Sequence, residues 1–69
     1  MLYEIHIPQK NLVLPVTNPY LALSAALCRL KLDKRTDGHA RRSLLQTLTS
    51  QGSVALRNES ETIEIVCCD

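Results

Sequence analysis

The first residues of the chain alternate between apolar and polar side chains. Tyr3, Ile5 and Ile7 alternate with Glu4 and His6, which is the period of a strand with one buried face. The next residue is a proline, which cannot donate a ladder hydrogen bond. We therefore expect a half-buried strand that ends before residue 8.

The apolar run at residues 11–16 allows two interpretations. It is either a second strand, joined to the first by a hairpin over residues 8–11, or an extended segment that crosses the domain. Pro15 would restrict a strand here to the edge of a sheet. We favour the crossing segment, so the predicted sheet has no strand at this place.

Residues 17–33 have the apolar spacing of a helix. Asn18 is a suitable N-cap and Pro19 suits the first helical position. The stripe that would face the core recurs at helical spacing and consists of Leu23, Ala26, Leu27 and Leu30.

A second helix is predicted after a polar interruption at residues 34–38. Thr36 or Asp37 can cap it, and Gly52 is the expected stop just after Gln51. Its inner face carries Leu44, Leu45 and Leu48.

Residues 53–58 and 62–68 alternate again, which predicts a hairpin over residues 59–61. The last strand has the same pattern as the first, so we expect these two strands to be antiparallel neighbours. The predicted fold is a single α+β domain over residues 1–69, with the order strand, helix, helix, strand, strand. Its three-stranded antiparallel sheet carries both helices on one face. The expected core consists of Ile5, Ile7, Leu23, Leu27, Leu30, Leu44, Leu45, Leu48, Val54, Ile63 and Ile65.

Composition narrows the class of protein. The chain has 69 residues, of which 45% are hydrophobic, with no Phe or Trp, so the core must be aliphatic and small. Three cysteines without framework spacing argue against a secreted disulfide scaffold. The chain shows neither a signal-peptide pattern nor a membrane-spanning run, and we expect a cytoplasmic protein.

Charge is unevenly distributed along the chain. The net charge is only +1, yet six of the eight basic residues lie between Arg29 and Arg42. A solvated helix corner would explain many of them, but Arg41 and Arg42 fall in the first turns of a helix, where the dipole disfavours cations. This placement favours the binding of an anionic partner, either DNA or a protein with an acidic surface. The candidate binding residues are Lys34, Arg35, Arg41, Arg42, Ser43 and Gln46.

The segment RRSLLQTLTSQGSVALRNESETIEIV, residues 41–66, reads as a helix, a glycine stop and a two-stranded hairpin. Together with the preceding helix, it resembles the core of the winged helix-turn-helix superfamily. The resemblance covers about residues 19–66 and implies a recognition helix in the DNA major groove, with turn and wing on phosphates. It also implies that the first strand pairs with the wing. Independently of the resemblance, Arg42, Ser43 and Gln46 lie on one face of the predicted helix and supply the kinds of group that read base edges.

Other chemistry has little support in the sequence. Its Cys and His residues lack the spacing of a zinc site, and no nucleophile–base set or glycine-rich phosphate loop is present. We therefore expect no catalysis, metal or cofactor. The two open alternatives are a DNA-binding transcriptional regulator and a protein-interaction module, such as a small inhibitor or adaptor of a larger protein machine.

The predicted helices and sheet carry more apolar surface than a chain of this size can easily bury, which favours a homodimer. The candidates for the exposed patch are Leu12, Leu14, Val16, Leu21 and Leu32.

Overall fold

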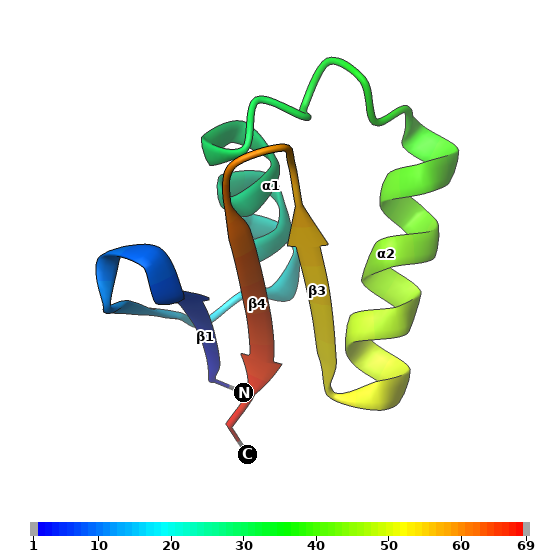
Figure 1. Cartoon of the computed structure of the whole chain (residues 1–69). Coiled ribbons are helices and arrows are strands. Elements are labelled where there is room, and N and C mark those ends of the chain that lie inside the picture. Colours follow the sequence, from blue (N-terminus) through cyan, green and yellow to red (C-terminus); the bar gives the residue numbers. More distant parts are fainter. Residues whose placement is uncertain (1, 69) are drawn as a thin grey trace.

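The computed structural model describes residues 2–68, which form one four-stranded antiparallel sheet and two helices (Figure 1). The strand order across the sheet is β2-β1-β4-β3. The elements along the chain are β1 (Tyr3–Ile7), the short 3₁₀ helix η1 (Pro8–Lys10), β2 (Leu12–Val16), α1 (Pro19–Arg29), α2 (Gly38–Gln51), β3 (Ser53–Arg57) and β4 (Thr62–Cys67). The α+β class and the antiparallel sheet are therefore confirmed.

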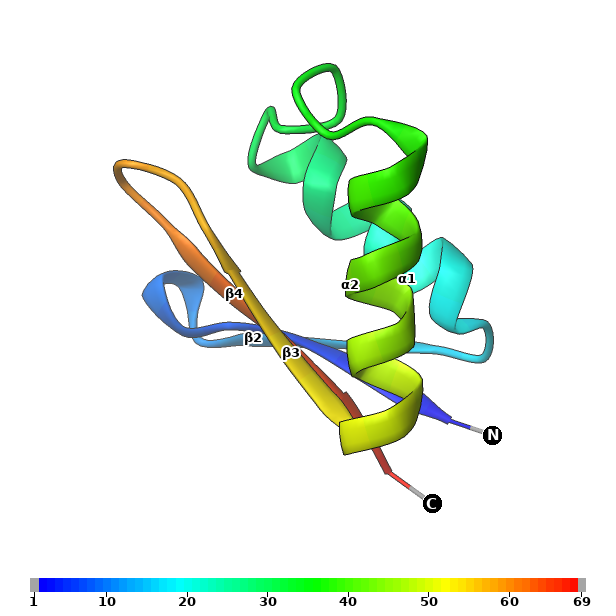
Figure 2. The same ribbon diagram turned by 90° about the vertical axis from the view of Figure 1, so that its right-hand side faces the viewer.

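Both helices cover the same face of the sheet, as predicted (Figure 2). α1 packs mainly over β1, and α2 packs over β3 and β4. The first and last strands are antiparallel neighbours, with Ile5 opposite Ile65. The β3–β4 hairpin turns at residues 58–61. The other face of the sheet carries no helix (Figure 2).

The prediction of a three-stranded sheet is wrong, because residues 12–16 form a fourth strand. β2 pairs antiparallel with β1, with Ile7 opposite Leu12 and Tyr3 opposite Val16. Asn11 makes the reversal possible by adopting a left-handed conformation, with φ of 50°, which asparagine tolerates better than most residues. The crossing segment that we favoured is thus excluded, whereas the edge position implied by Pro15 is confirmed.

Side-chain caps define where the helices begin. The Asn18 side chain accepts hydrogen bonds from the N–H groups of Tyr20 and Leu21, and that of Asp37 accepts from the N–H of Ala40 at 2.8 Å. These bonds satisfy N–H groups that have no partner within the helix. Asp37, rather than Thr36, is therefore the N-cap of α2.

Gly52 ends α2 in the left-handed conformation, with φ of 82°, as the sequence predicted.

α1 ends at Arg29, several residues before the predicted end. The N–H groups of Lys31 and Leu32 donate to the carbonyls of Cys28 and Leu27, at 3.1 and 2.8 Å. Lys31 itself is left-handed, with φ of 59°. This is the Schellman arrangement, whose left-handed position is usually glycine. Glycine is the usual sequence signal for the end of a helix. This helix end could not be recognised from the sequence because lysine occupies the position.

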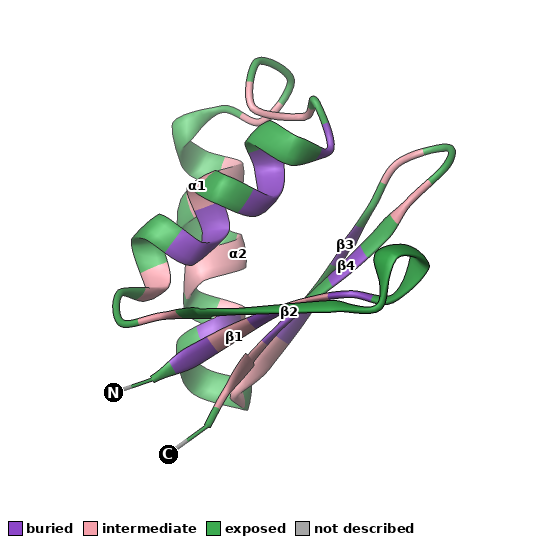
Figure 3. Cartoon of the chain, turned by 90° about the vertical axis from the view of Figure 1, so that its left-hand side faces the viewer, coloured by how far each residue is buried: buried purple, intermediate pink, exposed green. Residues whose placement is uncertain are grey.

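The core is aliphatic except for Tyr3 and lies between the helices and the sheet (Figure 3). Nine of the eleven predicted core residues are buried: Ile5, Ile7, Leu23, Leu27, Leu30, Leu48, Val54, Ile63 and Ile65. Leu44 and Leu45 are only half-buried against this core, so the inner face of α2 is covered fully only at Leu48. The core also includes Tyr3, Ala22, Ala26 and Leu56.

Within residues 2–68, neither helix has the length and apolarity that crossing a membrane requires.

Candidate functional site

The structure assigns Arg41 a bonding role inside the connection between the helices. Its Nε donates to the carbonyl of Thr36 at 3.0 Å, and its terminal nitrogen donates to the carbonyl of Asp33 at 2.6 Å. Both carbonyls belong to the turn that leads into α2. Because its guanidinium already serves these acceptors, Arg41 is less available to an anionic partner than its neighbours.

The other candidate binding residues are exposed. Lys34 and Arg35 lie in the connection 30–37, while Arg42, Ser43 and Gln46 lie on α2. The fold therefore presents the predicted residues to solvent. Arg35 and Arg42 line two different clefts, whereas Lys34, Ser43 and Gln46 line neither of them.

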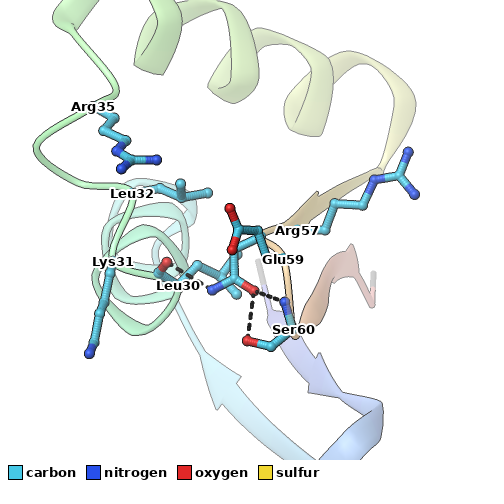
Figure 4. Close-up of a pocket in the computed structure, with 8 residues that line it drawn as sticks. Leu30, Lys31, Leu32, Arg35, Arg57, Glu59 and Ser60 are labelled. Carbon is cyan, nitrogen blue, oxygen red and sulfur yellow. Dashed lines mark hydrogen bonds between the residues drawn. The ribbon is translucent and has the colours of Figure 1, made fainter.

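The larger cleft lies between the end of α1 and the β3–β4 hairpin (Figure 4). Its volume is about 470 Å³, and its lining residues are Leu30, Lys31, Leu32, Arg35, Arg57, Asn58, Glu59 and Ser60. Three of these are cations: Lys31 and Arg35 come from the helix connection, and Arg57 comes from β3. The fold has thus brought Arg57, from β3, next to Lys31 and Arg35 of the helix connection.

Side-chain directions give the cleft a mixed character. In Figure 4, Arg35 points toward the middle of the cleft, where Leu32 and Glu59 also lie. Lys31 and Arg57 point outward from its two sides. An apolar floor with charges around it can bind a ligand that has both apolar and anionic groups.

The cations of this region are not neutralised by neighbouring carboxylates. Among the ion pairs of residues 2–68, none involves Lys31, Arg35 or Arg57. In contrast, Arg29 pairs with Glu61 of the hairpin turn at 3.3 Å. The pair removes Arg29 from the available cations and neutralises one of the two acidic residues of the turn.

The second cleft has a volume of about 230 Å³ and lies between the helices. Its lining residues are Tyr20, Gly38, Arg41, Arg42 and Leu45. Arg42 is its exposed cation.

We use the term basic end for the five exposed cations on and beside the helix connection, none of which has an ion pair among the described residues. They are Lys31, Lys34, Arg35, Arg42 and Arg57. Sequence reasoning missed Lys31 and Arg57 as site residues. Lys31 follows the end of a helix, where cations are favoured without any binding role. Arg57 is 22 residues from Arg35 along the chain, so no local pattern connects these two.

The described residues contain no group of three His, Cys, Asp or Glu side chains that could hold a metal ion. The cleft side chains supply cations, amide groups and one carboxylate, which are binding groups.

Comparison of this chain with protein-family models, with curated proteins and with solved structures finds no match.

Proposed function

We propose that this protein is a cytoplasmic DNA-binding regulator that contacts phosphates through its basic end. The observation that carries the proposal is the gathering of five exposed cations without ion pairs from three segments of the chain. Cations that form no ion pair are available to phosphates, and the release of DNA counterions then drives binding. Free thiols at Cys28 and Cys67 are compatible with the reducing cytoplasm.

α2 would supply the sequence-reading surface. Ser43 and Gln46 are exposed on this helix, where Ser43 directly follows the exposed cation Arg42 and Gln46 lies one turn after it. Hydroxyl and amide groups are the side chains that read base edges in a major groove. Phosphate contacts at the basic end would position the helix, and these two residues would contribute sequence preference.

The resemblance to winged helix-turn-helix domains supports the same assignment. α1 and α2 are followed directly by the β3–β4 hairpin, and β1 pairs with β4, which is the pairing that the resemblance implies. One feature differs: a β1–β2 hairpin precedes the helices. The proposal therefore rests on the charges more than on the topology.

A second candidate is a protein-interaction module that binds an acidic protein surface. The larger cleft favours it, because Leu30 and Leu32 line that cleft beside Glu59. Apolar contacts with a charged rim suit a protein side chain, whereas a carboxylate in the cleft repels a phosphate.

The decisive experiment is a fluorescence-anisotropy titration with random duplex DNA at two salt concentrations. About four phosphate contacts per chain predict a log–log slope of Kd against salt of about 3.6 in magnitude, from roughly 0.9 per contact. Arg35→Glu should weaken binding strongly. Lys10→Glu makes the same change in net charge outside the basic end and should have a small effect.

DNA binding is excluded if no duplex binds more tightly than about 100 µM at low salt, since non-specific binding is ordinarily as tight as this or tighter. A pull-down with and without nuclease then tests the second candidate. A protein captured equally in both arms, and lost with Arg35→Glu, would support the interaction module.

A homodimer belongs to the same proposal, because the molecule exposes large apolar side chains. Of the five candidates for this patch, Leu12, Leu14 and Leu21 are exposed. Val16 and Leu32 are half-buried against the core, so their assignment to the patch is wrong.

A further inference from the structure

The exposed apolar side chains lie in one part of the molecule. All large hydrophobic side chains that are exposed among the described residues belong to the first 21 positions, and none belongs to α2, β3 or β4. They are Leu2, Leu12, Val13, Leu14, Tyr20 and Leu21. Half of them are consecutive residues of the edge strand β2 (Figure 3).

Most of these side chains lie in an uncharged stretch of the chain. Residues 11–28, which include all of β2 and nearly all of α1, contain no Asp, Glu, Lys or Arg. Protein interfaces are depleted of charged residues at their centre. An uncharged edge strand beside an uncharged helix face is therefore suited to pairing with another protein surface.

The backbone of β2 has one outward donor. The N–H of Cys67 donates to the carbonyl of Gly52, and that of Cys68 donates to the carbonyl of Leu2. These bonds show which residues of β4 and β1 direct their backbone groups toward which neighbouring strand, and they therefore set the alternation across the whole sheet. By the alternation of antiparallel ladders, Leu12, Leu14 and Val16 face β1, while Val13 and Pro15 face away from the sheet. Proline has no N–H, so Val13 alone offers an outward donor within β2.

We propose that β2 pairs antiparallel with β2 of a second copy, about a two-fold axis at Val13. This inference specifies the homodimer of the proposed function. The N–H of each Val13 donates to the carbonyl of Val13 in the other copy, and Leu12 lies opposite Leu14 of the other copy. The sequence Leu-Val-Leu is symmetric about Val13, so both halves of an isologous interface are satisfied by the same residues.

The charges favour a second copy over another protein. A two-fold axis brings each side chain close to its own equivalent, so any charge near the axis would be repelled. The uncharged run 11–28 avoids this repulsion. A longer foreign strand would gain little, because Pro15 cannot continue the ladder beyond Val13.

Pairing at this edge also covers the exposed leucines. Leu12 and Leu14 point to the helix-bearing face, because they lie opposite the buried Ile7 and Ile5. In the eight-stranded sheet that results, the two β1 strands are about 14 Å apart at three strand spacings. The α1 helices above them would then lie on both sides of these leucines, farther apart than the roughly 8–10 Å of directly packed helices, so that the leucines fill the space between them.

The surface available is sufficient. A standard interface buries about 800 Å² of each partner, while the surface of this chain is 4697 Å². Small domains gain stability by such burial.

The test is sedimentation equilibrium of the full chain at micromolar concentration without nucleic acid, so that its result is independent of DNA binding. The wild type should have twice the chain mass. Val13→Asp places two carboxylates at the axis and should give a monomer. Ala55→Asp makes the same type of change at an exposed position of the opposite edge strand, β3, and should leave the dimer intact.

Mixing Val13→Asp with Val13→Lys separates an interface effect from misfolding. Each variant alone should be a folded monomer by circular dichroism, and the mixture should form a heterodimer because opposite charges meet at the axis. A monomeric wild type overturns the proposal. So does a dimer that survives Val13→Asp, or a mixture that remains monomeric.

Discussion

Asn58 connects the β3–β4 turn to the end of α1. Its Nδ2 donates to the carbonyl of Leu30 at 3.0 Å, while its Oδ1 accepts from the N–H groups of Ser60 and Glu61 at 2.8 and 2.7 Å. The Leu30 carbonyl lies just past the last turn of α1, where carbonyls lack intrahelical partners. One side chain thus serves both walls of the larger cleft and sets their separation.

Asn58→Ala should lower the free energy of unfolding by about 1–3 kcal/mol, because it leaves half-buried backbone groups of both walls without their partner. Ser60→Ala, in the same turn, removes only an exposed hydroxyl contact and should change stability by less than about 0.5 kcal/mol. Urea denaturation of both variants measures the difference. Equal stability of the two would refute the connecting role of Asn58.

Lys31→Gly should raise the free energy of unfolding by about 0.5–1 kcal/mol. Lysine is strained at φ of 59°, whereas glycine adopts this conformation without a steric penalty, and only part of the gain is lost to the freer unfolded chain. Lys34→Gly, at a position without positive φ, should give no gain. Thermal melts of both proteins test this. If DNA binding also weakens in Lys31→Gly, the strained lysine contributes a contact.

Arg41→Ala and Arg42→Ala should differ in their effects on stability and on DNA binding. The first removes the bonds to the carbonyls of Thr36 and Asp33 and should cost about 1–3 kcal/mol of stability. The second removes an exposed cation and should leave stability nearly unchanged while weakening DNA binding. Denaturation and anisotropy on the same preparations distinguish them. A fully stable Arg41→Ala protein would contradict the bonding role.

Leu48→Ala should cost about 2–5 kcal/mol, since Leu48 is fully buried and truncation leaves a cavity. Leu45→Ala should cost clearly less, because Leu45 is half-buried and lines an open cleft between the helices. Chemical denaturation of both variants measures which of them has the lower free energy of unfolding. The reverse order would mean that α2 packs with a different face.

Gln46→Ala should change which DNA sequence is preferred, since Gln46 is exposed on α2 where base edges would be read. Arg35→Ala should weaken all sequences alike, because phosphate contacts carry no base information. Competition titrations with a selected and a scrambled duplex separate the two effects. An unchanged preference in Gln46→Ala would remove this helix from base readout.

Local patterns were sufficient for most elements of the fold. Alternation in β1, β3 and β4, the cap residue Asn18 and the stop at Gly52 all follow from side-chain period and backbone geometry. These signals act between residues close in sequence, so they can be recognised without the fold. The composition similarly required a core made mostly of Leu, Ile, Val and Ala, to which the structure adds Tyr3.

The tertiary structure decided the rest. β2 reads as an apolar run with a proline, and only pairing with β1 made it a strand. Leu45 has the spacing of a core residue, yet the position of α2 relative to α1 leaves it half-buried at a cleft. Burial depends on which elements meet, and the period of one helix contains no information about its neighbour.

The candidate site, like the fold, was partly evident from the sequence and partly decided by the tertiary structure. The sequence alone indicated a basic segment with Lys34, Arg35 and Arg42 exposed, because charged side chains are rarely buried. Only the folded chain showed that Arg41 is held by two carbonyls and that Arg57 joins Arg35 at one cleft. Hydrogen-bond geometry and long-range strand placement determine these roles, and both arise only when distant segments pack together.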